Sequence, residues 1–202
     1  MKNKQTNQNP RKSKGRLFSE IWNYLRESKN YILFAIVIFL YTMLAALILP
    51  IPGAIDEQIK VILKELVEKT RGLGTFEMIV FLFKNNIYAS FIGLFLGIIL
   101  GIVPFITAVS NGYILGYVLK IVIADSGLST LWRILPHGIF ELPALVISLG
   151  LGLKLGTVIF SKNILKEFSK RLIISIKAFF ILIAPLLIIA AVIEGVLINL
   201  LG

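Results

Sequence analysis

The stretch LPHGIFELPALVISLGLGLKLG, Leu135–Gly156, is apolar along nearly its whole length and still contains His137 and Glu141. His137 is the only histidine of the chain. Helical steps of about 100° per residue put His137, Glu141, Ala144 and Ser148 on one narrow stripe. An ionisable side chain at membrane depth is costly to bury, so it normally faces protein or water and pairs with another group. We therefore expect a transmembrane helix whose polar stripe faces other helices, with His137 paired to Glu141 one turn away.

The composition of the whole chain agrees with a membrane location. Hydrophobic residues make up 57% of the 202 residues, and the mean hydropathy is +0.88, which is too apolar for an ordinary soluble domain. The chain has no cysteine, which excludes a disulfide framework and thiolate chemistry. The net charge of +10 would suit nucleic-acid binding in a soluble protein, but in a membrane protein it encodes orientation. We predict an all-α integral membrane helical bundle that binds no nucleic acid, metal ion or cofactor.

Five apolar segments approach the roughly 20 residues that are needed to cross about 30 Å of hydrocarbon. They are residues 31–49, 87–103, 105–124, 134–156 and 178–201. Pro104 lies between the second and third segments without a flanking charge, so these two spans either cross fully or form a partial hairpin.

The segments outside these spans are more polar. Residues 1–15 are predicted to be a disordered basic cytoplasmic tail, and residues 16–202 a single membrane domain. Residues 16–29 suit either an interfacial helix on anionic headgroups or a helical extension packed on a neighbour. Residues 54–71 have the pattern of an amphipathic helix, and residues 75–86 that of a second short helix at the membrane surface. Together, residues 54–86 form the predicted outward segment.

The distribution of Lys and Arg predicts the orientation. The N-terminal region and residues 154–177 carry 14 of these residues, whereas the opposite side carries 7. By the positive-inside rule, the N-terminus is cytoplasmic and the C-terminus lies outside. We expect a multi-pass protein of the cell membrane.

Small residues at intervals of four predict close helix packing, because packing rather than hydrophobicity drives helix association in lipid. The glycines concerned are Gly93, Gly97, Gly101, Gly112, Gly116, Gly152 and Gly156. These surfaces could also hold a homo-oligomer together. Pro136 suits a first helical turn, whereas Pro143 is expected to remove one backbone hydrogen bond and break the fourth span into two halves.

Several polar residues are expected to meet in a buried cluster, and Glu194 is interpreted as an interface residue near the end of the last span. The predicted members are His137, Glu141, Asn111, Asn86 and Ser148. One hypothesis is a hydrogen-bonded structural cluster, and another is an ion or proton site of a transporter. A metal-dependent enzyme is disfavoured, because His137 and Glu141 are too few ligands and no H-E-x-x-H or G-x-S-x-G motif is present.

Several motifs resemble those of the stage II sporulation protein M family. They are Leu135-Pro-His-Gly-Ile-Phe-Glu-Leu-Pro-Ala, Ser148-Leu-Gly-Leu-Gly, Phe83-Lys-Asn-Asn and Ser110-Asn-Gly before a tyrosine. The resemblance covers most of the chain from Tyr31 onward and implies a five-span protein of the cell membrane. It also implies a role like that of the family's namesake, which works with two peptidoglycan hydrolases at the septum of spore-forming bacteria. The family occurs in organisms that form no spores as well.

The sequence as a whole favours a non-enzymatic integral membrane scaffold that organises partner proteins around the buried polar cluster. These partners are membrane or extracytoplasmic proteins that the sequence does not identify. The alternative is a small membrane transporter or permeation protein that uses His137 and Glu141 as an ion or proton site.

Overall fold

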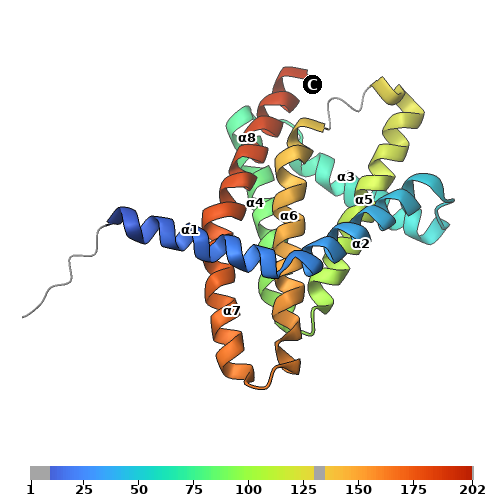
Figure 1. Ribbon diagram of the computed structural model, residues 1–202. Helices are drawn as coiled ribbons and strands as arrows, with labels where there is room; N and C mark the ends of the chain where they lie inside the picture. The colour runs from blue at the N-terminus through green and yellow to red at the C-terminus, as the bar shows by residue number, and fades with distance from the viewer. Residues whose placement is uncertain (1–9, 130–134, 202) are drawn as a thin grey trace, which may run out of the picture.

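A computed structural model describes residues 10–129 and 135–201, with side chains for residues 15–129, 138–198 and 200. All regular structure in this part of the chain is helical (Figure 1). The elements in order are α1 (Pro10–Glu27), α2 (Lys29–Ile48), α3 (Gly53–Thr70), α4 (Thr75–Phe95), the 3₁₀ turn η1 (Leu96–Ile98), α5 (Ile102–Ser126), α6 (Leu135–Gly156), the 3₁₀ turn η3 (Thr157–Phe160), α7 (Ile164–Ala178), the π-helical turn η4 (Phe179–Ile183) and α8 (Ala184–Leu201).

Five segments of the described chain are long and apolar enough to cross a membrane, which confirms the predicted fold class. They are Lys29–Ile48, Thr75–Ile98, Ile102–Ser126, Gly138–Phe160 and Ile164–Ile198. The second and third segments are each long enough to cross completely, and η1 leads into a tight turn that joins them.

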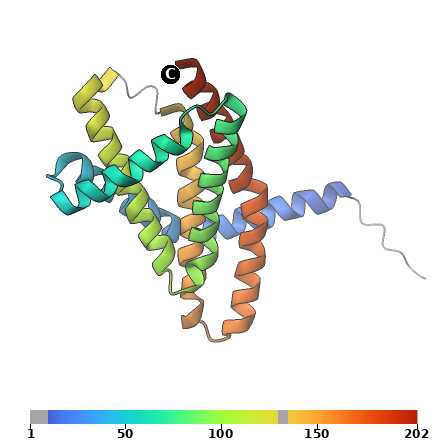
Figure 2. The same ribbon diagram turned by 180° about the vertical axis from the view of Figure 1, so that it is seen from behind.

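Helix α6, which contains the stretch quoted at the outset, is the central helix of the bundle. In its most apolar window 67% of the residues are buried, against 17–33% in the other four spans. It contacts α2, α4, α5 and α8, and Figures 1 and 2 show it between α5 and α8. A helix that is apolar on all sides is expected to take such a position.

Glycines on two faces of α6 explain how it approaches two neighbours at once. A Cβ atom added at Gly152 would collide with the backbone of Gly93, and one added at Gly97 would collide with Gly152. On another face, a Cβ atom at Gly150 would collide with the backbone of Ile32 in α2. Close backbone contact of this kind is the main source of packing energy between helices in lipid.

The remaining predicted glycines also lie at helix contacts. Gly112 and Gly116 of α5 lie against the α2 backbone at Phe39 and Met43. Farther along, Gly156 lies against Gly101. The glycine surfaces are therefore used for contacts within one chain, and a homo-oligomer would need a different surface.

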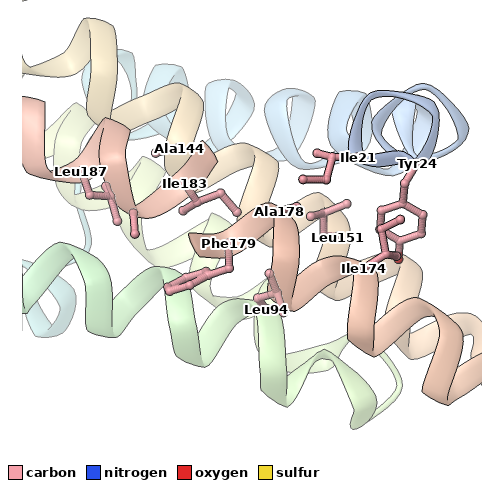
Figure 3. Close-up of a cluster of buried hydrophobic side chains, with 11 residues drawn as sticks. Ile21, Tyr24, Leu94, Ala144, Leu151, Ile174, Ala178, Phe179, Ile183 and Leu187 are labelled. Carbon is pink, nitrogen blue, oxygen red and sulfur yellow. The ribbon is translucent and has the colours of Figure 1, made fainter. Parts of the chain in front are cut away.

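The apolar core joins α1, α4, α6, α7 and α8 around Phe179. Figure 3 shows Phe179 beside Leu94, Ala178 and Ile183, with Ile21 and Tyr24 reaching the same cluster from α1. Phe179 makes edge-to-face contacts with Phe91 and Phe95 of α4, at ring-centroid distances of 5.8 and 6.1 Å. Such aromatic pairs add about 0.5–1.5 kcal/mol beyond area burial. Phe179 also begins the π-helical turn that joins α7 to α8.

Two predicted helix boundaries are wrong. Residues 75–86 do not form a separate surface helix, because α4 continues from Thr75 through Lys84 and Asn86 to Phe95. Neither Gly nor Pro occurs in residues 75–86, and Asn86 has a partner on α6, so its polarity does not end the helix. The fifth span likewise begins at Ile164 rather than at residue 178, because α7, the π-helical turn and α8 follow one another directly.

One of the prolines behaves differently from its prediction. Helix α6 continues through Pro143, so the predicted break into two halves is not observed. Pro143 is exposed, and a proline in a membrane helix is tolerated when neighbouring groups satisfy the freed carbonyl. The turn before α5 is made by Leu100 and Gly101, with φ of 54° and 73°, while Pro104 lies in the first turn of α5. A proline there removes no hydrogen bond, because that amide has no partner within the helix.

Helix α1 combines both structures considered for residues 16–29. Ile21 and Tyr24 are buried in the core, whereas Phe18 and Trp22 are exposed. Glu20 forms an ion pair with Lys177 of α7 at 3.0 Å. One face of α1 therefore packs on the bundle, and the other face is free to contact lipid headgroups.

Candidate functional site

Polar side chains from three transmembrane helices meet at a small cavity in the bundle. Asn86 and Ser90 come from α4, Asn111 from α5 and Glu141 from α6, and Ala89, Leu145 and Leu187 complete the lining. The cavity has a volume of about 10 Å³, which is room for about one water molecule. The structure therefore places three of the five predicted cluster residues at one point.

Glu141 and Asn86 are directly linked in this cluster. The side-chain amide of Asn86 donates a hydrogen bond to the Glu141 carboxylate. The amide nitrogen of Asn111 instead donates to the backbone carbonyl of Thr107 at 2.8 Å, one turn earlier in its own helix. The amide oxygen of Asn111 can accept further hydrogen bonds.

Ser148 joins α6 to α4 rather than lining the cavity. Its hydroxyl donates a 2.6 Å hydrogen bond to the backbone carbonyl of Ser90, and both serines are fully buried. The Ser90 hydroxyl has no hydrogen-bond partner among the described residues. A buried hydroxyl without a partner costs about 1–3 kcal/mol, so Ser90 is an unusual feature of the core.

Glu194 of α8 belongs to the same region, which the interpretation as an interface residue near the span end missed. Its Oε2 atom is buried without a hydrogen-bond partner in the described part of the chain, and its charge interacts with that of Glu141. The signal that could have revealed it is its position as the single charged residue of α8. A lone carboxyl group in an apolar span is expected to find a polar site on a neighbouring helix.

The predicted His137–Glu141 pair lies only partly within the described residues. His137 belongs to α6, one turn before Glu141, but its side chain, like that of Pro136, is outside the described part of the structure. The pair therefore stays a prediction. Among the described residues, no group of three or more His, Cys, Asp or Glu side chains is arranged to hold a metal ion.

A second polar site fastens α1 to the opposite end of α6. Lys154 is only 7% exposed, and its ammonium group lies 4.0 Å from the centroid of the Tyr24 ring. The same ammonium group donates to the Ser28 hydroxyl at 3.1 Å and approaches Glu27 at 3.5 Å. Burial raises the pKa of the Tyr24 hydroxyl, which lies outside the membrane-spanning segments. Lys154 thus satisfies its buried charge with groups of α1 and the α1–α2 junction.

Helix α3 is attached to the other end of the bundle by Asp56. The carboxylate of Asp56 accepts hydrogen bonds from Lys60 at 2.7 Å and from the Tyr117 hydroxyl of α5 at 2.6 Å. These two hydrogen bonds, with that from Lys60 the stronger influence, lower the pKa of the Asp56 carboxyl. Nearby, Lys120 donates to the backbone carbonyl of Leu49 at 2.6 Å. The hydrogen bond from Tyr117 to Asp56 therefore joins α3 to α5.

Most apolar side chains of α3 are not covered by the bundle. Ile59 is buried, whereas several other apolar residues are exposed. The exposed ones are Ile55, Val61, Ile62, Leu66 and Val67. An exposed apolar face on a fixed helix is typical of an interaction surface.

Comparison with known families agrees with the motifs found in the sequence. The family model described as Stage II sporulation protein M matches residues 30–197, which run from the start of α2 into the last turns of α8. The comparison with curated proteins and the comparison with solved structures find no match. The family match includes the cavity, the contact of Asp56 with Tyr117 and all but the end residues of the five spans, whereas Tyr24, Glu27 and Ser28 of the α1 attachment precede it. The chain is therefore a membrane protein that belongs to the Stage II sporulation protein M family.

Proposed function

We propose that this protein is a non-enzymatic membrane scaffold that organises partner proteins at the cell membrane. The observation that carries the proposal is helix α3, which presents exposed apolar side chains while Asp56 and Tyr117 hold it in place. A fixed surface lowers the entropy that a partner loses on binding. A scaffold needs such a surface to bind its partners.

The packing of the bundle supports the same proposal. Glycine contacts bring the backbones of α4 and α6 together, and others join α2 to α5 and α6. Helices packed in this way form a rigid body, because their backbones cannot slide without collision. Helix α1 packs on this body through α7 and α2, and α3 is joined to it through Tyr117.

The contacts at the two ends support the proposed orientation. Helix α1 forms ion pairs with Lys154 of α6 and with Lys177 of α7, so it lies beside the basic segment 154–177. Helix α3 contacts Tyr117 in the second half of α5, at the other end. By the positive-inside rule, we infer that α1 is cytoplasmic and that α3 faces the outside, where it would contact membrane or extracytoplasmic proteins.

Single-cysteine labelling tests this orientation directly, because the chain has no natural cysteine. We expect Lys64→Cys in α3 to react with a membrane-impermeant maleimide in intact cells. Lys166→Cys in α7 should react only after the cells are opened. The reverse pattern would overturn the orientation.

Site-specific photocrosslinking tests the scaffold role. A photoreactive residue at Val67, whose side chain is 63% exposed on α3, should crosslink to a discrete protein in native membranes. The matched control is Leu165 at the other end of the bundle, which is 80% exposed and should give no crosslink to that protein. In addition, Val67→Asp should abolish co-purification of the partner without changing the amount of folded protein.

Two outcomes would overturn the scaffold proposal. One is that Val67 crosslinks to no protein, or to the same proteins as Leu165. The other is that purified protein in liposomes moves ions or solutes, and that Glu141→Gln abolishes this flux while the fold survives. The second result would establish the transport alternative.

A further inference from the structure

The cavity beside Glu141 contains oxygen atoms whose hydrogen-bonding capacity is not used. The Ser90 hydroxyl is fully buried, lines the cavity and has no partner among the described residues. It lies on the same helix as Asn86, one turn away, and close to the carboxylate of Glu141. A buried polar atom without a partner normally indicates strain, a missing water or a bound ion.

Two asparagines, Asn86 and Asn111, also line the cavity. The nitrogen of Asn111 donates to Thr107, and the nitrogen of Asn86 donates to Glu141. A side-chain amide has one oxygen with two lone pairs besides its nitrogen. The cavity is thus lined by four oxygen-bearing side chains from three helices: Asn86, Ser90, Asn111 and Glu141.

The charge and size of the cavity restrict the ligand. Glu141 supplies a carboxyl group, Glu194 is close enough to interact with it, and no cationic side chain lines the cavity among the described residues. Hard cations prefer oxygen ligands. A magnesium ion normally keeps several waters, and calcium takes about six to eight oxygens, so neither fits a space for one water-sized sphere.

We propose that Asn86, Ser90, Asn111 and Glu141 bind a single desolvated sodium ion that joins α4, α5 and α6. The Ser90 hydroxyl then gains a partner, and the ion offsets the buried charge of Glu141. Because the ion contacts three helices, it stabilises the assembled bundle. This inference does not depend on the scaffold proposal.

Thermal unfolding of the purified protein in detergent tests the sodium site. The protein is titrated with NaCl at constant ionic strength, with N-methyl-D-glucamine chloride making up the balance and KCl in a parallel series. A ligand that binds only the folded state stabilises it by mass action. When the sodium concentration is ten times the dissociation constant, Tm should be about 3–5 °C higher than without sodium. The rise should level off at high sodium concentration and should be much smaller in potassium.

Two buried serines provide matched variants. Ser90→Ala removes a buried hydroxyl that has no partner among the described residues, so it should raise Tm in the sodium-free buffer and remove most of the rise with sodium. Ser148→Ala removes the hydrogen bond to the Ser90 carbonyl, so it should lower Tm in both buffers and keep the rise. Opposite responses of these two variants separate ion binding from general damage to the core.

Binding of ²²Na⁺ measures the site independently of stability. One ion should bind per chain, and Ser90→Ala should weaken its binding by at least about tenfold, the change expected for the loss of about 1.4 kcal/mol. Glu141→Gln should abolish the binding, whereas His137→Gln should retain it because His137 is not a proposed ligand. Equal Tm in sodium and N-methyl-D-glucamine, or a sodium effect that persists in Ser90→Ala, would overturn the proposal.

Discussion

Replacing Gly152 of α6 by alanine should separate α4 from α6. The new methyl group would collide with the backbone carbonyl of Gly93 and crowd Leu94, and a backbone cannot move aside as a side chain can. Overpacking costs about 1–3 kcal/mol, and this contact justifies the upper end. The higher helix propensity of alanine offsets about 1 kcal/mol of this cost. We therefore expect a net loss of about 2 kcal/mol in the free energy of unfolding.

Gly138 of the same helix provides the matched control. A Cβ atom there would meet only the Leu142 side chain, at 3.7 Å, which is an ordinary van der Waals contact. Gly138→Ala should therefore stabilise the protein by up to about 1 kcal/mol. A glycine-to-alanine substitution in α6 is thus predicted to lower the free energy of unfolding at position 152 and to raise it at position 138.

Thermal unfolding in detergent, followed by circular dichroism, measures both variants. For a chain of this length, 1 kcal/mol corresponds to about 2–4 °C in Tm. Gly152→Ala should lower Tm by about 4–8 °C, and Gly138→Ala should raise it by about 2–4 °C. Equal effects at the two positions, or a stabilised Gly152→Ala, would refute the packing of α4 on α6 described above.

Three further predictions concern the polar sites. Lys154→Ala should loosen α1 through the loss of a desolvated cation–π contact worth about 2 kcal/mol, with faster hydrogen exchange in α1. Lys154→Met keeps an apolar stem and should have a smaller effect. Glu141→Ala should destabilise the bundle by about 1–3 kcal/mol because the Asn86 amide loses its acceptor, whereas Glu141→Gln should keep the fold, as measured by Tm. The lowered pKa of Asp56 contributes stability above the unfolded-state value of about 4, and this contribution is lost as the pH falls below it. The hydrogen-exchange protection factors of α3, corrected for the intrinsic exchange rate at each pH, should therefore fall below about pH 4.

Controls and contrary outcomes distinguish these predictions from general instability. Tyr117→Phe removes one hydrogen bond to Asp56 and should reduce the pH effect on α3 exchange. Unchanged α1 exchange in Lys154→Ala would show that the Tyr24 contact contributes nothing. A Glu141→Gln protein that aggregates like Glu141→Ala would show that the charge itself is required for folding.

Most of the fold could be predicted from hydropathy, because each membrane span must be long and apolar whatever its neighbours are. The prediction that α4 is interrupted at Asn86 was wrong, because hydropathy alone does not show whether a polar residue has a partner inside the membrane. A polar residue inside a span resembles a helix end until its partner is known, and the partner of Asn86 is Glu141, far away in sequence. The continuity of α6 through Pro143 also depends on surrounding helices.

The sequence alone determined that this chain is a helical membrane protein of five spans, which residues are small enough for close packing, and to which family it belongs. Only the tertiary structure decided that Gly152 meets Gly93, that Gly150 meets Ile32, and that Glu194 lies near Glu141. Hydrophobic periodicity indicates which residues of a helix are excluded from water. Lipid and protein interior are equally apolar, so this pattern does not specify which helix faces which, and the pairing follows from the shapes of the surfaces that pack together.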